Sequence, residues 1–311
     1  MQPFDPRILP PHRPRADGPF VPAFAAQAQA PGFAAASLDF HPYLPLPAGT
    51  LLARRFEITE ALGEGHCGYV YLVRDRAAQN ALRALKTFDP RRGEAKDAEL
   101  FRREARLLKR LDHPRIPKGY DLCDHRGMLC ACVAFVQGED LLAHVQQHGP
   151  MPEREAQIVM RQVLESLIYL HGQKPAVLHR DLKPENLIRD QAGTIHLIDF
   201  GSASDRPQDK QGVALEALTT LHTMGYAAPE QALGLEAYPA SDLYSLAATV
   251  LYLLTGKNPL VLYNGMEGRL AWKVPLSGGF DALLSEMLAL PAKARVQSAR
   301  EALARLDGFT I

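Results

Sequence analysis

Two acids, an amide and a lysine lie close together in residues 177–201, which read VLHRDLKPENLIRDQAGTIHLIDFG. Asp181, Lys183 and Asn186 fall within one tight loop, and Asp199 ends the apolar segment that follows it. These groups suit phosphoryl transfer, in which a carboxylate accepts the proton of an attacking hydroxyl and cations stabilise the transferred group. Amide and carboxylate oxygens are suitable ligands for Mg²⁺, so we expect Asn186 and Asp199 to be metal ligands and Asp181 to be the base.

The motifs HRDLKPEN and DFG both stand intact in this stretch, in that order. Together they resemble the protein kinases, in particular the bacterial-type members of the serine/threonine branch. The resemblance covers about residues 50 to 307. It implies transfer of the γ-phosphoryl group of ATP to Ser or Thr hydroxyls of protein substrates, with ATP and Mg²⁺ as cofactors. It also places Lys183 beside the moving phosphoryl group.

A glycine cluster lies far upstream of this stretch, within FEITEALGEGHCGYVYLVRD. Gly63, Gly65 and Gly68 have the spacing G-x-G-x-x-G, and apolar and polar residues alternate on both sides. This alternation predicts two antiparallel strands joined by a tight turn, whereas the dinucleotide-binding motif of the same spacing opens a helix. We therefore expect a hairpin whose backbone amides cover phosphate groups.

The residue at the tip of this hairpin is Cys67, where the kinase family usually has an aromatic side chain. Two interpretations are open. A thiolate beside bound phosphates would react with oxidants and alkylating agents. A packed thiol would only fill a gap between neighbouring residues.

A third predicted strand contains RALK, which resembles the lysine strand of the kinases and places Lys86 on the α- and β-phosphates. In DAELFRREARLLKRLDH, Leu100, Leu108 and Leu111 form a helical stripe, and Glu104 falls on the same face. A carboxylate on an apolar stripe requires a buried cation. We expect Lys86 to provide it, in the lysine–glutamate ion pair of active kinases.

The resemblance also assigns the rest of the nucleotide site. The segment MLCACVAFVQGEDL reads as a strand that runs into the linker between two lobes, with backbone hydrogen bonds to adenine and a ribose contact from Asp140. The residues expected to contact the nucleotide are Leu62, Gly63, Gly65, Gly68, Val70, Ala84, Lys86, Ala134, Val136, Asp140 and Ile188.

The polar segment SASDRPQDKQGVALEALTTLHTMG follows DFG and leads to YAAPE. Its length without periodicity is typical of a functional loop, and it resembles the kinase activation segment. Thr223 is assigned to the substrate-facing turn, and Thr219 or Thr220 to autophosphorylation. We expect the phosphate to meet Arg180, an unpaired cation until then, with Glu216 as a partial substitute.

Two contacts in the larger lobe are also expected from the resemblance. Glu230 of the APE motif should form a buried ion pair with Arg295, and Asp242 should hold the backbone of the catalytic loop. Asp242 opens the apolar run DLYSLAATVLYLLTG. This run is shorter than the roughly 20 residues of a membrane span, so it predicts a core helix.

The composition allows a substantial core, because 47% of the 311 residues are hydrophobic and 23% are charged. Lys and Arg together equal Asp and Glu at 35 each, so the overall charge indicates neither nucleic acid nor an anionic membrane as a partner. The four cysteines form no CxxC pair, which argues against a cysteine zinc site or a disulfide framework. We expect a cytoplasmic protein.

The chain divides into a tail and one α+β domain with a two-lobed, kinase-like fold. Residues 1–45 are rich in proline and alanine and are expected to be disordered. Five phenylalanines in this tail leave two interpretations, a passive spacer or a segment that docks a partner. Residues 46–311 form the kinase domain, with a strand-rich N-lobe with one helix at about 50–136 and a mainly helical C-lobe at about 137–307.

Two other classes of protein share this fold. A scaffold without catalysis normally loses Lys86, Asp181 or Asp199, and all three are present. A kinase that acts on small molecules or lipids usually lacks the combination of HRDLKPEN and APE. The sequence therefore favours a protein kinase.

Overall fold

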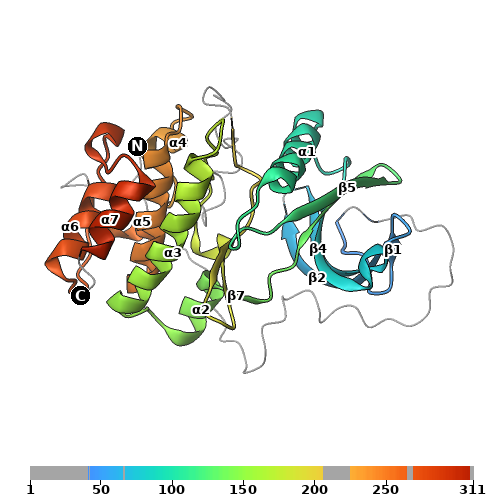
Figure 1. The fold of residues 1–311 in the computed structure, drawn as a ribbon, viewed down its shortest axis with the longest axis horizontal. Coiled ribbons are helices and arrows are strands. Elements are labelled where there is room, and N and C mark those ends of the chain that lie inside the picture. Colours follow the sequence, from blue (N-terminus) through green and yellow to red (C-terminus); the bar gives the residue numbers. More distant parts are fainter. Residues whose placement is uncertain (1–40, 42, 66, 206–224, 265–268, 309–311) are drawn as a thin grey trace, which may run out of the picture.

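The computed structural model describes residues 41, 43–65, 67–205, 225–264 and 269–308. Two lobes lie side by side along the long axis of the molecule (Figure 1). One lobe is a curved sheet with a single long helix, and the other is mainly helical. The predicted α+β architecture with two lobes is confirmed.

The N-lobe is built on a six-stranded antiparallel sheet with the strand order β1-β2-β3-β4-β6-β5. Its strands are β1 Leu51–Leu52, β2 Phe56–Gly65, β3 Gly68–Asp75, β4 Ala81–Phe88, β5 Gly119–His125 and β6 Met128–Ala134. Burial alternates at the start of β2, where Phe56 and Ile58 point inward, whereas β3 and β6 are buried along most of their length. The buried cluster consists of Leu52, Phe56, Ile58, Tyr69, Tyr71, Val73, Leu85, Cys130 and Cys132.

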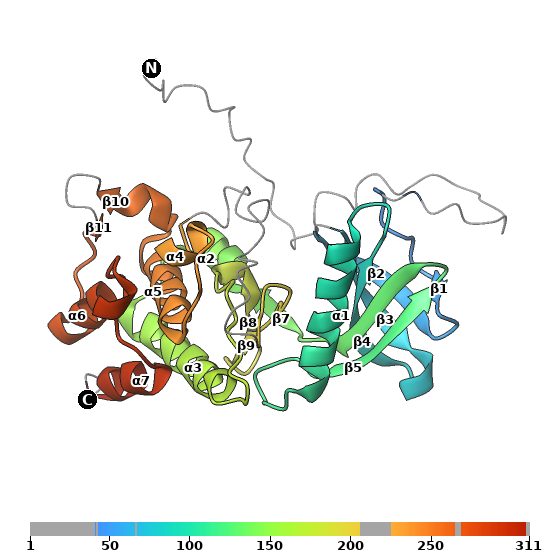
Figure 2. The same cartoon turned by 90° about the horizontal axis from the view of Figure 1, so that it is seen from above.

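The helix α1, Ala95–Arg110, packs alongside β5 (Figures 1 and 2). Its buried side chains are Glu104, Ala105, Leu107 and Leu108. The predicted apolar stripe is therefore correct for Leu108 and Leu111, which are buried, but wrong for Leu100, which is 39% exposed. Leu107 takes the place in the core that the sequence assigned to Leu100, because the buried face is centred on the C-terminal half of the helix.

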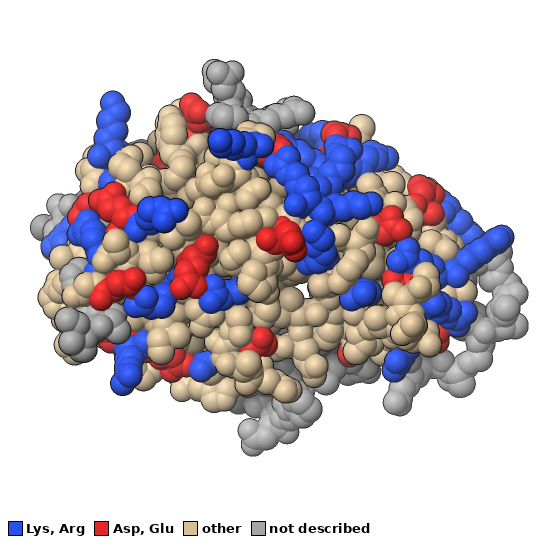
Figure 3. Space-filling view, viewed as in Figure 1, with Lys and Arg blue, Asp and Glu red and all other residues tan. Residues whose placement is uncertain are grey.

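Basic side chains gather over α1 and its surroundings (Figure 3). Arg103 and Arg110 of this helix both contact Asp205, at 3.1 and 3.0 Å between nitrogen and oxygen. Arg103 also donates to the hydroxyl of Ser204 at 2.6 Å. The equal totals of acidic and basic residues therefore conceal an uneven surface, and α1 is tied to the residues that follow DFG.

The C-lobe begins with a small sheet of order β7-β8-β9 and continues as helices. Its strands are β7 Gly138–Asp140, β8 Leu187–Asp190 and β9 Ile195–Leu197, with a separate pair β10 Tyr263–Asn264 and β11 Arg269–Leu270. Its helices are α2 Leu141–His148, α3 Glu153–His171, α4 Pro229–Ala232, α5 Pro239–Thr255, α6 Gly278–Met287 and α7 Ala299–Asp307. Short 3₁₀ turns cover Arg76–Ala78, Pro184–Asn186, Pro259–Leu262 and Ala292–Ala294.

The core of the C-lobe surrounds α5, in which every side chain from Ala240 to Leu254 is buried. The helices α3 and α6 pack against it and contribute further apolar side chains. The apolar run at residues 243–255 is therefore the core helix that the sequence predicts. Within the described residues, none of the helices combines the length and apolar character needed to cross a membrane.

Candidate active site

The glycine hairpin has the predicted form, because β2 and β3 pair in antiparallel register and close with Gly65 opposite Gly68. The three glycines differ in their surroundings. A Cβ atom on Gly63 would meet nothing within 4 Å, and one on Gly65 would lie 3.6 Å from the nearest atom. A Cβ on Gly68 would lie 2.0 Å from the carbonyl oxygen of Thr87. The open space belongs to the first two glycines, whereas the third is required by packing against β4.

This difference predicts opposite effects of two alanine substitutions. Gly68→Ala forces β3 away from Thr87, and we expect it to destabilise the fold by about 1–3 kcal/mol, the usual cost of overpacking. Gly65→Ala, the matched control, should leave the unfolding midpoint nearly unchanged but weaken nucleotide binding by filling the space under the hairpin. Urea denaturation and nucleotide titration separate the two effects. Equal stabilities of the two variants would contradict this division of roles.

The thiol of Cys67 is partly buried against the loop between β4 and α1. The backbone oxygen of Cys67 accepts a hydrogen bond from the amide of Asp89 at 2.7 Å. Burial raises the pKa of the thiol, and the nearby carboxylate of Asp97 raises it further. A raised pKa disfavours the thiolate. The structure thus favours the packing interpretation of Cys67 over that of a reactive cysteine.

The side chain of Arg92 is only 8% exposed and contacts several residues of the glycine hairpin. Its guanidinium pairs with Glu64 at 2.7 Å and donates to the carbonyl oxygen of Gly65 at 3.3 Å. The same group lies 5.1 Å from the ring centre of Tyr69 and 5.5 Å from that of Tyr43, within cation–π range. Arg92 was missed in the sequence, since four of its contacts come from strands or segments distant along the chain.

Lys86 of β4 joins the two lobes of the site. Its ammonium contacts the carboxylate of Glu104 on α1 and, at 2.7 Å, that of Asp199. Burial alone would lower the pKa of Lys86, but the charges of Asp199 and Glu104 outweigh it and raise the pKa. The charge of Lys86 in turn lowers the pKa of Asp199. The predicted pair of Lys86 with Glu104 is therefore present, and it includes Asp199 as a third member.

The catalytic loop brings three predicted residues into direct contact. Lys183 lies 3.0 Å from Oδ2 of Asp181, and the side-chain amide of Asn186 donates to the same oxygen at 3.0 Å. Asn186 also donates to the backbone oxygen of Asp181 at 2.7 Å. Burial tends to lower the pKa of Lys183, but the charge of Asp181 and their hydrogen bond raise it. The Asp181 carboxylate is thus oriented from two sides.

The backbone is strained at one residue of this loop, Arg180, and at Asp199 of DFG, and buried polar side chains hold the loop in place. Arg180 and Asp199 have φ angles of 67° and 62°, in the left-handed region that costs non-glycine residues about 1–3 kcal/mol each. The buried carboxylate of Asp242 accepts the amides of His179 and Arg180 at 2.9 and 2.8 Å. Gln231 donates to the backbone oxygen of Arg180 at 2.9 Å. The role expected of Asp242 is thus observed, and Gln231 adds a support that the sequence did not reveal.

The side chain of Arg180 differs from its prediction. It was expected to be an unpaired cation, but it is buried, with 6% relative exposure, and it has interaction partners. The prediction was wrong because the sequence shows that Arg180 is charged but does not show that neighbouring segments bury its side chain.

The residues predicted to hold Mg²⁺ offer a suitable donor set. Asn186 directs its amide nitrogen to Asp181, which leaves its side-chain oxygen to serve as a ligand. Asp199 uses Oδ1 for Lys86 and is 44% exposed, so part of its carboxylate remains accessible. Two hard oxygen donors fit Mg²⁺, which keeps several waters in its shell.

The adenine and ribose end of the site is shaped by β6, β7 and β8. The amide of Ala134 already donates to the carbonyl oxygen of Lys118 at 2.8 Å. If Ala134 contacts adenine, the carbonyl oxygen of Ala134 must therefore make that contact. Asp140, expected at the ribose, caps α2 by accepting the amide of Ala143 at 2.8 Å. Ile188 lies opposite Asp140 in the register of β7 and β8.

The apolar walls predicted for the nucleotide come from the glycine hairpin and the adjoining strand. Leu62 is 37% exposed, and Val70 and Ala84 are half-buried. Val70 lies opposite Lys86 in the pairing of β3 with β4. The predicted wall residues thus occupy the strands that carry Lys86, while Val136 belongs to the linker after β6.

Comparison with known protein families identifies the family of this chain. The family model described as "Protein kinase domain" matches residues 56–304. The chain belongs to the protein kinase family. The predicted bacterial-type serine/threonine kinase domain is confirmed by its relatives, which are described next.

This kinase domain is 35% identical over 282 residues to serine/threonine-protein kinase F of Synechocystis sp., covering 83% of the chain and 56% of the relative. It is 33% identical over 222 residues to serine/threonine-protein kinase PrkC of Bacillus subtilis, covering 68% and 32%. It is 36% identical over 224 residues to serine/threonine-protein kinase PknF of Mycobacterium tuberculosis, covering 70% and 46%. The chain therefore spans roughly a third to just over half of the length of these relatives.

The kinase domain carries its APE glutamate in a fully buried ion pair. Glu230 accepts two parallel hydrogen bonds from Arg295, at 2.6 and 2.8 Å, and a third from Ser241 at 2.6 Å. The side chain of Arg295 is 0% exposed and also donates to the carbonyl oxygens of Ala289 and Leu290. The predicted pair is thus present with its polar groups satisfied.

The activation segment of the kinase domain is described only at its two ends. Thr219, Thr220, Thr223 and Glu216 lie outside the described residues. The described beginning contacts α1 through Ser204 and Asp205, and the end leads into α4. The assignments made for the three threonines stay predictions.

Proposed function

We propose that the protein transfers the γ-phosphoryl group of ATP to Ser or Thr hydroxyls of protein substrates. The observation that carries this proposal is the contact of Lys86 with both Glu104 and Asp199. It links the N-lobe helix to the DFG motif, an arrangement that phosphoryl transfer by kinases requires. A scaffold that had lost catalysis would have no need to keep these three charges together.

The residues of the catalytic loop would share the chemistry as follows. Asp181 orients the substrate hydroxyl and accepts its proton, because its carboxylate is fixed by Lys183 and Asn186. Lys183 stabilises negative charge on the transferred group, and Lys86 positions the α- and β-phosphates. Asn186 and Asp199 would hold Mg²⁺, which neutralises charge on the nucleoside phosphates. The glycine hairpin covers those phosphates.

A labelled-phosphate assay tests the proposal. The protein is incubated with MgATP and a generic acceptor such as myelin basic protein, and the labelled residues are identified after hydrolysis. Label on Ser and Thr supports the proposal. Transfer to tyrosine alone, or to a small molecule or lipid in place of the protein acceptor, would contradict the proposal and show that this kinase catalyses a different reaction.

Binding of MgATP should also stabilise the fold, because a ligand specific for the native state adds about 2.7 kcal/mol at 100 times its Kd. We expect a rise in the melting temperature with MgATP that is lost in large part on addition of EDTA. Asp199→Ala should lose most of the magnesium-dependent rise. The contrary result, a wild-type protein unaffected by millimolar MgATP, would remove the basis for nucleotide binding.

We further propose that the kinase is activated by autophosphorylation at Thr219 or Thr220. The proposal rests on their position ahead of Thr223 in the sequence, and on the ties from α1 to Asp205, which couple this segment to Glu104. Peptide mapping after incubation with MgATP should find the phosphate, and the double alanine variant should be markedly less active. An unphosphorylated segment, or full activity of that variant, would contradict the proposal.

The tail at residues 1–45 remains a proposed docking segment, and a cytoplasmic location remains a prediction. The described end of the tail does contact the N-lobe, since the ring centre of Tyr43 lies 5.5 Å from the guanidinium of Arg92. A truncation that tests docking should therefore stop before residue 41, where the described contacts begin.

A further inference from the structure

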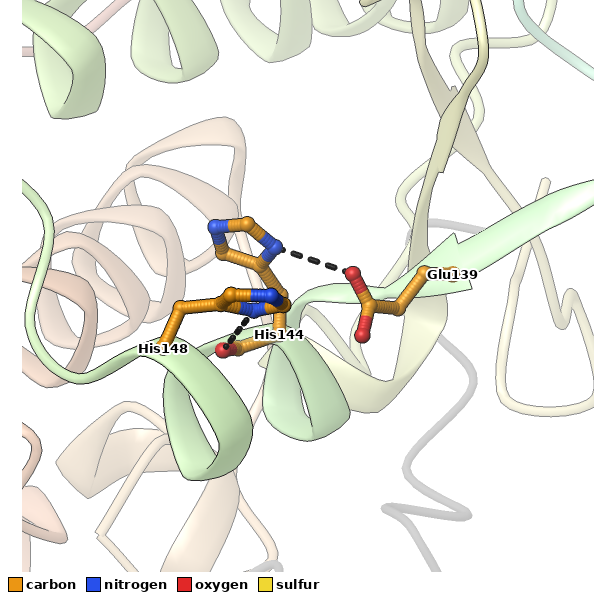
Figure 4. A group of neighbouring side chains, drawn as sticks. All are labelled: Glu139, His144 and His148. Atoms are coloured by element: carbon orange, nitrogen blue, oxygen red, sulfur yellow. Dashed lines mark hydrogen bonds and ion pairs between the residues drawn. The ribbon is translucent and has the colours of Figure 1, made fainter. Parts of the chain in front are cut away.

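Three potential metal ligands gather beside the nucleotide site, outside the residues assigned to catalysis (Figure 4). Glu139 comes from β7, and His144 and His148 come from α2. Their ligand atoms all lie within 4.8 Å of one another. His144 Nδ1 is 2.9 Å from a carboxylate oxygen of Glu139, and the two imidazole rings are stacked with centroids 4.6 Å apart.

The local fold explains why these side chains meet. His144 and His148 are four residues apart, so they share one face of α2. Glu139 precedes the helix immediately, and the cap that Asp140 provides fixes the turn between β7 and α2. The side chains of Glu139 and His144 are 33% and 18% exposed, and His148 is exposed, so an ion can enter from solvent.

The hydrogen bonds of the two histidines indicate which ring nitrogen of each would bind a metal. His148 Nδ1 lies 3.1 Å from the backbone oxygen of His144, and a carbonyl oxygen only accepts. In the neutral ring the proton is therefore on Nδ1, and Nε2 carries the lone pair. His144 Nδ1 and the carboxylate of Glu139 share a proton across 2.9 Å, and a divalent ion would displace this proton and take both atoms as ligands.

We propose that Glu139, His144 and His148 bind a divalent transition-metal ion, of which Zn²⁺ fits best. Two imidazoles and one carboxylate form a three-ligand set that Zn²⁺ uses with water in the fourth position. Bonds of 2.0–2.2 Å place tetrahedral ligands about 3.4 Å apart, so the group must contract slightly. The exposed His148 can supply that movement by rotating its side chain.

This site is distinct from the proposed Mg²⁺ site, because it shares no residue with Asn186 or Asp199. Imidazole ligands favour zinc-like ions, whereas Mg²⁺ prefers oxygen ligands alone. A bound ion connects the last turn of α2 to β7. The ion would thereby restrict the movement of Asp140, the residue expected at the ribose, which lies between the ligands Glu139 and His144.

Titration of the metal-stripped chain with ZnCl₂ tests the proposal, with calorimetry for stoichiometry and thermal unfolding for stabilisation. The wild type should bind one ion at this site and melt at a higher temperature. His148→Ala, at an exposed position, should lower affinity by at least about 10- to 100-fold, the loss caused by removing even an outer partner of a ligand. Glu139→Gln keeps a hydrogen bond to His144 but removes the carboxylate. It should therefore weaken Zn²⁺ binding if Glu139 is a ligand, and leave binding unchanged if Glu139 is only a structural contact.

His196→Ala is the matched control. His196 lies 2.9 Å from Asp190, the same separation as His144 from Glu139, but the structure describes no second histidine in that pair. Its affinity for Zn²⁺ should equal that of the wild type. Visible absorption of bound Co²⁺ should appear in the wild type and in His196→Ala, and be lost in His148→Ala. Equal affinity of wild type and His148→Ala, or no binding by the wild type, would overturn the proposal.

Discussion

Replacing Asp181 with asparagine should lower kcat by about 10²- to 10⁴-fold, the range that a positioned general base contributes. Asparagine keeps the shape of the side chain and can still bond to its neighbours, but it cannot accept the proton of the substrate hydroxyl. The affinity for ATP should change little, since Asp181 contacts Lys183 and Asn186 and is not assigned to the nucleotide. Steady-state assays with labelled ATP separate kcat from KM.

Asp112→Asn provides the control for this change. The side chain of Asp112 is 94% exposed and lies outside the catalytic loop, so the same loss of one negative charge occurs at a solvated position. Its activity should match the wild type, and both variants should unfold at the wild-type midpoint. A nearly active Asp181→Asn variant would show that another group accepts the proton.

Arg295→Ala should strongly destabilise the C-lobe, with a cost of about 3–5 kcal/mol in the free energy of unfolding. The substitution leaves the buried carboxylate of Glu230 with Ser241 as its remaining side-chain donor and removes the two bonds from Arg295. Urea denaturation measures the loss. Arg305→Ala is the matched control, because its pair with Glu286 at 2.8 Å is about a third exposed and such pairs contribute about 0–1 kcal/mol. Similar costs for the two variants would contradict the importance assigned to burial.

The same pair predicts a dependence on pH. Burial would raise the pKa of Glu230, but the hydrogen bonds from Arg295 and Ser241 outweigh it and lower the pKa below its usual value. A group whose pKa is lower in the folded state contributes stability above its unfolded pKa, about 4.3 for Glu, and loses it as the pH falls through the folded value. The stability difference between wild type and Arg295→Ala should therefore be constant near neutrality and shrink below about pH 4. A constant difference down to pH 3 would assign the effect to packing.

The parts of the site that the sequence predicts well are those set by local spacing. The catalytic loop, the DFG motif and the glycine hairpin each lie within a few consecutive residues, so their geometry follows from turns and strand pairing. The pair of Lys86 with Glu104 could also be predicted from the sequence, because a carboxylate within an apolar helical stripe requires a cation. Asp242 and the Glu230–Arg295 pair required the family resemblance, since their partners are remote in the chain.

The features that the sequence did not predict depend on which segments approach one another in three dimensions. Gly68 is required by the backbone of Thr87 on the next strand, and Leu100 is exposed because α1 buries its C-terminal half. The partners of Arg180 are likewise invisible along the chain. The proposed zinc ligands did leave a signal, two histidines four residues apart with a preceding acid, but this signal contains no cysteine and is common on solvated helices.

The position of Arg92 makes two distant equilibria interdependent. One guanidinium holds the glycine hairpin through Glu64 and Gly65 and also packs on Tyr43, at the end of the N-terminal tail. If a partner docks on the tail as proposed and displaces Tyr43, we expect it to alter the hairpin and hence nucleotide affinity. By thermodynamic reciprocity, bound nucleotide must change the affinity of the tail for that partner by the same factor. Under the proposed docking role, the tail and the phosphate cover would form a single linked system, in which occupancy of one reports on the other.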